Sequence, residues 1–192
     1  MNNNVKSVII VGVGGQGTLL ASRILGAVMM DENYDVKVSE VHGMSQRGGS
    51  VVTYVRYGEK VASPIIEFGE ADVILAFEQL EAARYLPYLK EGGELIVNTQ
   101  CIDPMPVITG LAQYPTDITE KISNMNVKVT EVPAHKLAEE AGSVKAVNVV
   151  LIGAMASKLD FPKEVWLKAV KENVPSKFID LNVKAFDLAY GK

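Results

Sequence analysis

The chain of 192 residues contains one cysteine, Cys101, and two histidines, His42 and His135. One cysteine cannot form an internal disulfide, as is usual in a reducing compartment, and we expect a cytoplasmic protein. Iron–sulfur clusters and zinc fingers need several cysteine or histidine ligands. The sequence therefore predicts that the chain binds no metal of its own. We interpret Cys101 as an inert core or loop residue and His135 as a surface residue.

Long apolar runs and basic runs are also missing. No apolar stretch reaches the roughly 18 residues that a membrane-spanning helix needs. There is no run of four or more lysines or arginines, and the formal net charge is −4 with a pI near 5.3. Nucleic-acid-binding proteins rely on a basic surface. We therefore expect neither a membrane nor a nucleic acid as a partner.

Apolar β-branched stretches alternate with segments of helical periodicity. The predicted strands cover residues 5–11, 35–39, 51–57, 72–77, 94–98 and 127–130. The predicted helices cover residues 18–30, 78–89, 118–124, 133–141, 144–159, 162–173 and 176–190. The first two strands and the helix between them read as a βαβ unit, residues 58–66 as a hairpin, and residues 101–115 as irregular. The pattern predicts one α/β domain over residues 1–192, a Rossmann-like, largely parallel sheet flanked by helices, with a helical C-terminus.

A glycine-rich turn follows the first predicted strand and precedes the first helix. It matches G-x-G-x-x-G and could bind an anion at the helix N-terminus through Gly12, Gly14, Gly15, Gln16 and Gly17. Glu40, at the end of the second strand, lies about where a ribose-binding acid would stand. The alternative is a turn that serves only close packing of helix and strand.

A second polar segment lies between the second and third predicted strands. Its candidate contacts with substrate, cofactor or a neighbouring subunit are His42, Ser45, Gln46, Arg47, Gly48 and Gly49. Glycines there allow the backbone to approach another surface closely. Arg47 is the strongest candidate, because a guanidinium group holds carboxylates and phosphates in bidentate geometry. The alternative is a solvated connecting loop.

The predicted helix 144–159 is apolar nearly all round, which indicates burial on several sides. Asn148 within it must then find a hydrogen-bond partner, for example a loop backbone. Gly153 and Ala154 permit close approach of another helix or the sheet.

The glycine turn, the segment 40–52, the strand 72–77 and the helix region 146–153 together resemble one family. It is the gamma-type subunit of the 2-oxoacid:ferredoxin oxidoreductases, which act on pyruvate, ketoisovalerate or indolepyruvate. The segment Glu-Val-His-Gly-Met-Ser-Gln-Arg-Gly-Gly-Ser-Val, starting at Glu40, is most similar to the beta subunit of the indolepyruvate enzymes. The resemblance covers the chain up to about Leu159 and is weaker beyond.

The resemblance implies a multi-subunit enzyme that decarboxylates a 2-oxoacid, such as indolepyruvate or another aryl pyruvate, on thiamine diphosphate. Electrons would pass through iron–sulfur clusters to ferredoxin, and the acyl group would pass to coenzyme A. This chain lacks the Gly-Asp-Gly start of a thiamine motif and has one cysteine. The resemblance therefore implies an accessory subunit, inactive alone, with thiamine diphosphate and clusters on a large partner subunit. The alternatives are an NAD(P)-binding Rossmann-type dehydrogenase, a nucleotide-binding regulator, or a scaffold.

Overall fold

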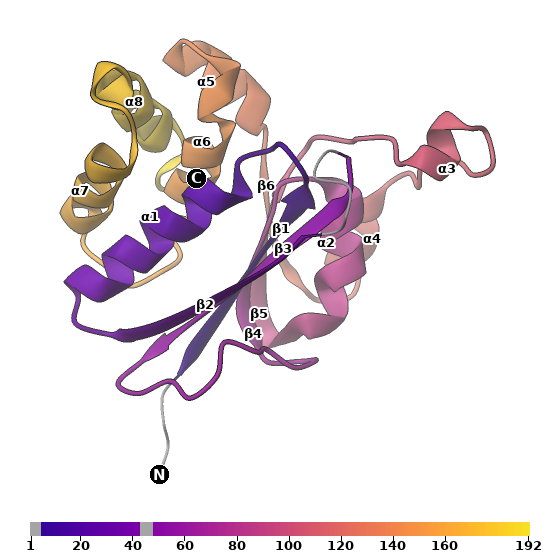
Figure 1. The fold of residues 1–192 in the computed structure, drawn as a ribbon. Coiled ribbons are helices and arrows are strands. Elements are labelled where there is room, and N and C mark those ends of the chain that lie inside the picture. Colours follow the sequence, from indigo (N-terminus) through magenta and orange to yellow (C-terminus); the bar gives the residue numbers. More distant parts are fainter. Residues whose placement is uncertain (1–4, 43–47) are drawn as a thin grey trace.

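The computed structural model describes residues 5–42 and 48–192, and its centre is one mixed sheet (Figure 1). The strands follow the order β2-β3-β1-β4-β5-β6 across the sheet. They are β1 (Lys6–Val13), β2 (Asp35–His42), β3 (Ser50–Gly58), β4 (Ala71–Ala76), β5 (Leu89–Asn98) and β6 (Lys128–Val132). The pairs β1–β4, β4–β5 and β5–β6 are parallel, and only β3 runs against its neighbours. The predicted, largely parallel α/β sheet is confirmed.

Strand β3 lies between β1 and β2. It pairs antiparallel with β1 from Lys6↔Tyr57 to Val13↔Ser50, and with β2 from Asp35↔Gly58 to His42↔Val51. Strands β1 and β2 therefore run in the same direction, as the predicted βαβ unit requires, but they are not neighbours. The sequence reading did not foresee this insertion, because local periodicity does not reveal which strands pair.

Helices cover both faces of the sheet (Figure 1). One face packs against α1 (Thr18–Asp31), α5 (Ala134–Ala141), α6 (Val147–Ala156), α7 (Lys163–Asn173) and α8 (Ile179–Ala189). The other face packs against α2 (Gln79–Tyr85) and α4 (Ile118–Ser123). The remaining helical segments are α3 (Met105–Ile108) and the 3-10 turns η1 (Leu86–Tyr88), η2 (Val144–Ala146) and η3 (Ser176–Phe178). The helical C-terminus is confirmed.

Two local predictions are wrong. Residues 61–66 form no strand, and Ile66 of this irregular segment is buried against apolar side chains of the sheet. The helix predicted to reach residue 89 ends at Tyr85, and Gly92 lies inside β5 instead of terminating the helix. In both places the backbone conformation is set by tertiary packing that the local pattern does not specify.

Helix α6 is buried along its whole length, which confirms the prediction of burial on several sides. A Cβ atom at Gly153 would lie 2.4 Å from the main-chain oxygen of Phe186, so glycine lets α8 pack closely against α6. Within residues 5–42 and 48–192, no helix combines the length and the apolar character needed to cross a membrane.

Candidate functional site

The glycine turn joins the carboxyl end of β1 to the N-terminus of α1. Gly15 and Gly17 adopt positive φ angles of 103° and 85°, which side-chain-bearing residues rarely adopt. Gly12 is required by space, because a Cβ atom there would lie 2.8 Å from Gln16 Oε1 and 2.9 Å from Phe77 Cβ. Tight packing therefore accounts for the first glycine of the pattern without any ligand.

The side chain of Gln16 folds back over the turn. Its Oε1 accepts from the backbone amide of Val13 at 2.7 Å, and its Nε2 donates to the main-chain oxygen of Phe77 at 3.0 Å and to Gln100 Oε1 at 2.9 Å. Phe77 follows β4, and the connections from β1 and β4 leave toward opposite faces of the sheet. Gln16 thus bridges the crevice at the switch point, where open α/β sheets generally hold their ligands.

Asn148 packs against the same turn from α6. Its Oδ1 accepts from the backbone amide of Val149 at 2.9 Å, and its Nδ2 lies 2.6 Å from the position of a Cβ atom at Gly17. The predicted need for a hydrogen-bond partner is confirmed, although this partner belongs to the helix's own backbone and not to a loop. Glycine at position 17 therefore makes room for this amide as well as adopting the positive φ.

A cavity of about 510 Å³ opens beside the turn. The turn contributes Gly15, Gln16 and Gly17 to its wall, and Lys145 and the exposed His135 line the opposite side. Backbone N–H groups at a helix N-terminus together with a lysine favour a negatively charged group. The sequence singled out the turn but not Lys145, which lies about 130 residues further along the chain.

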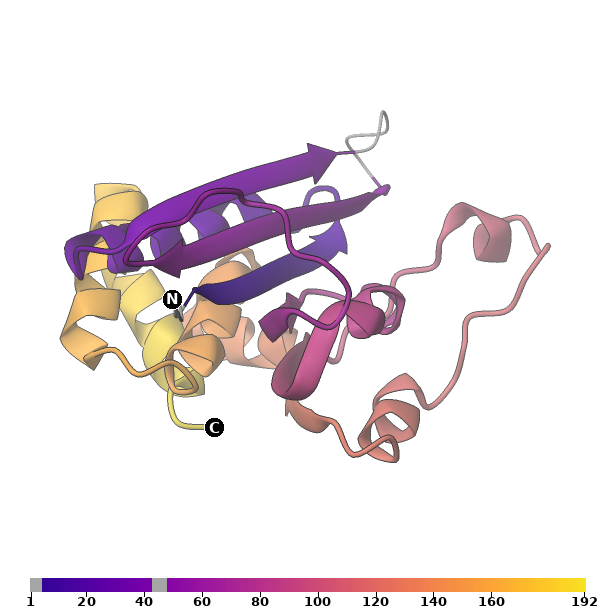
Figure 2. The same cartoon turned by 90° about the horizontal axis from the view of Figure 1, so that it is seen from below.

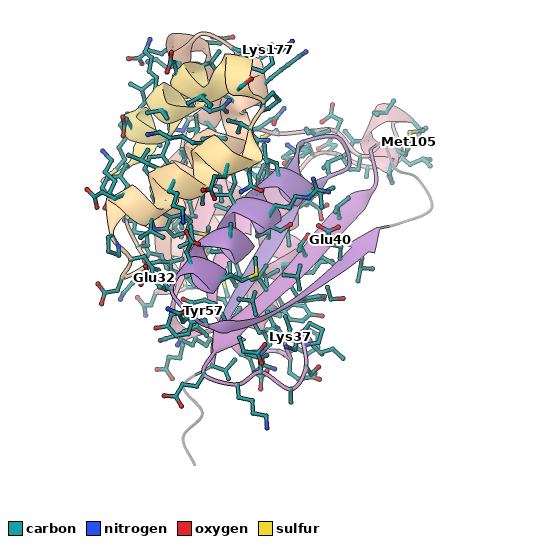
Figure 3. All side chains as sticks on the ribbon, turned by 60° about the vertical axis from the view of Figure 1, so that its left-hand side comes forward. Glu32, Lys37, Glu40, Tyr57, Met105 and Lys177 are labelled. Atoms are coloured by element: carbon teal, nitrogen blue, oxygen red, sulfur yellow. The ribbon has the colours of Figure 1, made fainter. Side chains whose placement is uncertain are left out.

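Glu40 is not brought to the glycine turn. Its Oε1 accepts from Ser22 Oγ of α1 at 3.2 Å, and it lines a groove between α1 and β2 (Figure 3). Because β3 separates β2 from β1, the acid is displaced sideways from its place in a dinucleotide-binding fold. This position counts against the ribose-binding role that the spacing suggested.

Three residues of the polar segment, Ser45, Gln46 and Arg47, lie outside the described residues, and of His42 the structure describes the backbone in β2. The carbonyl of Gly49 accepts from the amide of Gly14 at 2.9 Å. The end of the segment and the glycine turn, predicted separately, therefore lie side by side at the carboxyl end of β1.

Next to this junction lies a cavity of about 430 Å³, and Ser50, Glu81 and Arg84 form a polar cluster in its wall. Ser50 Oγ donates to Glu81 Oε2 at 2.5 Å, and Arg84 Nη1 donates to Glu81 Oε1 at 3.0 Å. Burial raises the pKa of the Glu81 carboxyl above its ordinary value, although Ser50 and Arg84 act in the opposite direction. The sequence did not reveal this cluster, because Ser50 at the start of β3 and Glu81 on α2 are 31 residues apart and meet only through the tertiary fold.

Glu78, also in this wall, is 1% exposed and caps α2. Its Oε2 accepts from the amide of Glu81 at 2.9 Å, while its Oε1 accepts from the amide of Ile102 at 3.1 Å and from the hydroxyl of Tyr114. Burial, followed by the bond to Glu78, raises the pKa of Tyr114. The acidic opening of the helix was visible in the sequence, but the two distant donors were not.

Side chains that could bind a metal ion are not grouped in the part of the chain that the structure describes. Within it, no three histidine, cysteine, aspartate or glutamate side chains come together as a possible metal site. Cys101 is exposed in a loop, and His135 is exposed on α5, in line with the sequence interpretation. The described arrangement places a glycine turn at the N-terminus of α1 and a neighbouring cavity with both polar and apolar lining residues at the carboxyl edge of the sheet.

Comparisons with known proteins match nearly the whole chain. The family model described as pyruvate ferredoxin/flavodoxin oxidoreductase matches residues 7–192. Indolepyruvate oxidoreductase subunit IorB of Thermococcus kodakarensis is 47% identical over 187 residues, covering 95% of this chain and 93% of that protein. The gamma subunit of a keto/oxoacid ferredoxin oxidoreductase from Geobacter sulfurreducens has a TM-score of 0.72 at 26% identity, and the match covers 96% of each chain.

The same fold also recurs inside a longer chain. The 2-oxoglutarate:ferredoxin oxidoreductase of Magnetococcus marinus, solved with 2-oxoglutarate, coenzyme A and succinyl-CoA, has a TM-score of 0.73 at 19% identity. That match covers 96% of this chain but 31% of the other. At this identity the likeness concerns the fold alone.

Proposed function

The chain belongs to the pyruvate ferredoxin/flavodoxin oxidoreductase family and is a subunit of an indolepyruvate/2-oxoacid ferredoxin oxidoreductase; from this we propose that it completes the site of a larger catalytic subunit. The observation that carries the proposal is the 47% identity to a separate oxidoreductase subunit over 95% of this chain. The family predicted from the glycine turn and the polar segment is thereby confirmed. The proposed substrates are indolepyruvate and other aryl pyruvates.

The cofactors of the reaction belong to the partner in this proposal. One cysteine cannot hold an iron–sulfur cluster, and the described residues offer no cluster of acids for the metal that accompanies a diphosphate. Thiamine diphosphate and the clusters would then sit on the large subunit, and ferredoxin would receive electrons through the complex. The assembly would work in the cytoplasm.

Coenzyme A is the proposed co-substrate, and its phosphates suit the glycine turn. Support comes from the N-terminus of the 14-residue helix α1, whose backbone N–H groups favour anions, and from Lys145 across the cavity. Arg47 is the proposed contact for a second anion, either the substrate carboxylate or a coenzyme A phosphate. His42, Gly48 and Gly49 would contact the substrate or the partner subunit.

The alternative of an NAD(P)-binding dehydrogenase or nucleotide-binding regulator is weakened by the position of Glu40. Its side chain bonds to Ser22 of α1, away from the glycine turn, so it does not stand where a ribose-binding acid would be needed. Calorimetry with NAD(P) on the purified chain decides between them. A dissociation constant below about 100 µM, or roughly 5.5 kcal/mol of binding, would revive the nucleotide-binding class.

The central test compares the lone chain with the complex co-expressed with its large subunit. We expect the lone chain to fold and to show no 2-oxoacid-dependent dye reduction with thiamine diphosphate and coenzyme A, and the complex to turn over indolepyruvate. Turnover by the lone chain would end the accessory-subunit proposal.

The polar segment is tested in the assembled complex with Arg47→Ala and His42→Ala. Lys171→Ala, an exposed substitution on α7, is the matched control for loss of a cationic side chain. Assembly is measured by size-exclusion chromatography, separately from turnover. Loss of a charged hydrogen-bond donor in a desolvated site costs about 1.5–3 kcal/mol, or one to two decades in rate. If both variants assemble and turn over like the control, the segment is a connector, and a scaffold role gains support.

A further inference from the structure

The segment 102–114, here called the apolar arm, stands away from the sheet (Figure 2). The chain leaves the body of the fold after β5, forms α3 in this segment and returns to the body before α4. The sequence predicted an irregular segment and gave no reason for its excursion. In Figure 3, Met105 projects from the arm at a distance from the helical layers.

The side chains on the arm are apolar and open to solvent. Met105 and Ile108 are each 65% exposed, and Leu111 is 85% exposed. Asp103 is the single charged residue among residues 102–114. Depletion of charge and enrichment in methionine are features of the buried centres of protein–protein interfaces. An apolar, nearly uncharged projection of this kind is characteristic of a surface that another protein covers.

Both roots of the arm are anchored to the body by one buried carboxylate. Glu78 Oε1 accepts from the amide of Ile102 at the outgoing root and from the hydroxyl of Tyr114 at the returning root. Within the arm, the amide of Leu111 donates to the carbonyl of Pro106 at 2.8 Å. Because these bonds order the arm before any partner arrives, less conformational entropy is lost when its side chains become buried.

We infer that the apolar arm is a docking element for the large catalytic subunit, an inference that rests on the proposed function. The arm is continuous with the site, because Met105 and Ile108 line the same cavity as Gly48 and Gly49. A partner that reaches the polar segment therefore meets the arm as well. The same fold occupies 31% of a longer chain in the 2-oxoglutarate enzyme, so this fold does occur attached to further protein.

Methionine oxidation measures whether the partner covers the arm. Met105 is 65% exposed, and Met30 on α1 and Met125 after α4, at 63% and 66%, serve as internal references. Dilute hydrogen peroxide should oxidise all three at similar rates in the lone chain. In the complex we expect the oxidation rate of Met105 to fall by about tenfold or more. Unchanged oxidation of Met105 in an intact complex overturns the inference.

A matched pair of double variants measures the contribution to affinity. Met105→Ser with Ile108→Ser removes two exposed apolar side chains from the arm, and Met30→Ser with Met125→Ser removes two of equal exposure elsewhere. Both variants should melt like the parent, because the residues are exposed. We expect the arm variant to bind the large subunit about tenfold to a hundredfold more weakly and the control to bind like the parent.

The outcomes separate this inference from the proposed function. If the parent chain itself does not bind the large subunit, the proposed function fails. If the parent binds and the folded arm variant binds equally well, only the docking role fails. Light scattering on the parent chain alone tests whether a second copy of this chain covers the arm instead. A dimer that the arm substitutions dissociate would assign the arm to a second copy of this chain and overturn its assignment to the large subunit.

Discussion

The side-chain amide of Gln16 donates to the main-chain oxygen of Phe77 at 3.0 Å, which ties the glycine turn after β1 to the residue that follows β4. The same side chain accepts from the amide of Val13 and donates to Gln100, so one residue satisfies polar groups from three parts of the chain. The glycine turn is therefore held by a side chain of its own pattern, and its shape does not depend on a ligand.

Removing this side chain should destabilise the protein. Gln16→Ala leaves the amide of Val13 and the carbonyl of Phe77 without their protein partner, and we expect a loss of about 1–3 kcal/mol in the free energy of unfolding. Gln16→Glu should lose more at neutral pH, because a carboxylate would face two acceptor oxygens. Urea unfolding measures both, with Gln113→Ala at an exposed position as the control. Equal stability of all three variants would contradict the bridging role.

The crowding between Gly17 and Asn148 predicts unequal effects within the glycine turn. Gly15→Ala introduces strain at a positive φ angle, although the new methyl group has open space around it. We expect the free energy of unfolding to fall by about 1–2 kcal/mol. Gly17→Ala introduces similar strain and also a clash with Asn148 Nδ2. We therefore expect its free energy of unfolding to fall by about 1–2 kcal/mol more than that of Gly15→Ala. Thermal unfolding of the two variants gives the difference. Equal losses would mean that Asn148 moves aside freely.

The hydroxyl of Tyr114 should hold the returning root of the apolar arm. Tyr114→Phe deprives the buried Glu78 carboxylate of one donor, and we expect the free energy of unfolding to fall by about 1–3 kcal/mol. Hydrogen exchange should become faster at Ile102 and along the arm. Tyr190→Phe, whose ring stacks on Phe186, is the control for loss of a tyrosine hydroxyl. Unchanged exchange in the arm would refute the anchoring role.

The buried Glu81 should make stability depend on pH. Its pKa is raised in the folded protein, chiefly by burial, above the ordinary value of 4.5. At pH values between 4.5 and the raised pKa of the folded state, the folded state binds more protons than the unfolded state. This group's contribution to stability therefore falls as the pH rises through that interval. Relative to Glu81→Gln, the parent should lose stability as the pH increases through this interval.

Urea unfolding from about pH 4 upward measures this difference, with Glu139→Gln on the exposed face of α5 correcting for the loss of one charge. If the parent instead gained stability relative to Glu81→Gln as the pH rises, the interactions with Ser50 and Arg84 would outweigh the burial of the carboxyl group.

The sequence by itself determined the family and most of the succession of elements, including all six strands of the sheet. Continuous β-branched stretches such as 5–11 and 72–77 specify buried strands, because a strand covered on both faces has no polar side. The glycine turn and the polar segment were recognisable because their residue types stand close together along the chain. Helix α6 was predicted as buried from its lack of a polar face.

Only the tertiary structure decided what depends on strand order. The placement of β3 between β1 and β2 moved Glu40 away from the glycine turn, although its sequence spacing suited a ribose contact. It also brought Ser50 to Glu81, while the path of the chain after β5 brought Tyr114 to Glu78. These pairs are 31 and 36 residues apart, and no periodicity reports on them. Such contacts form because strand pairing and core packing select one arrangement of the whole chain, which no local pattern encodes.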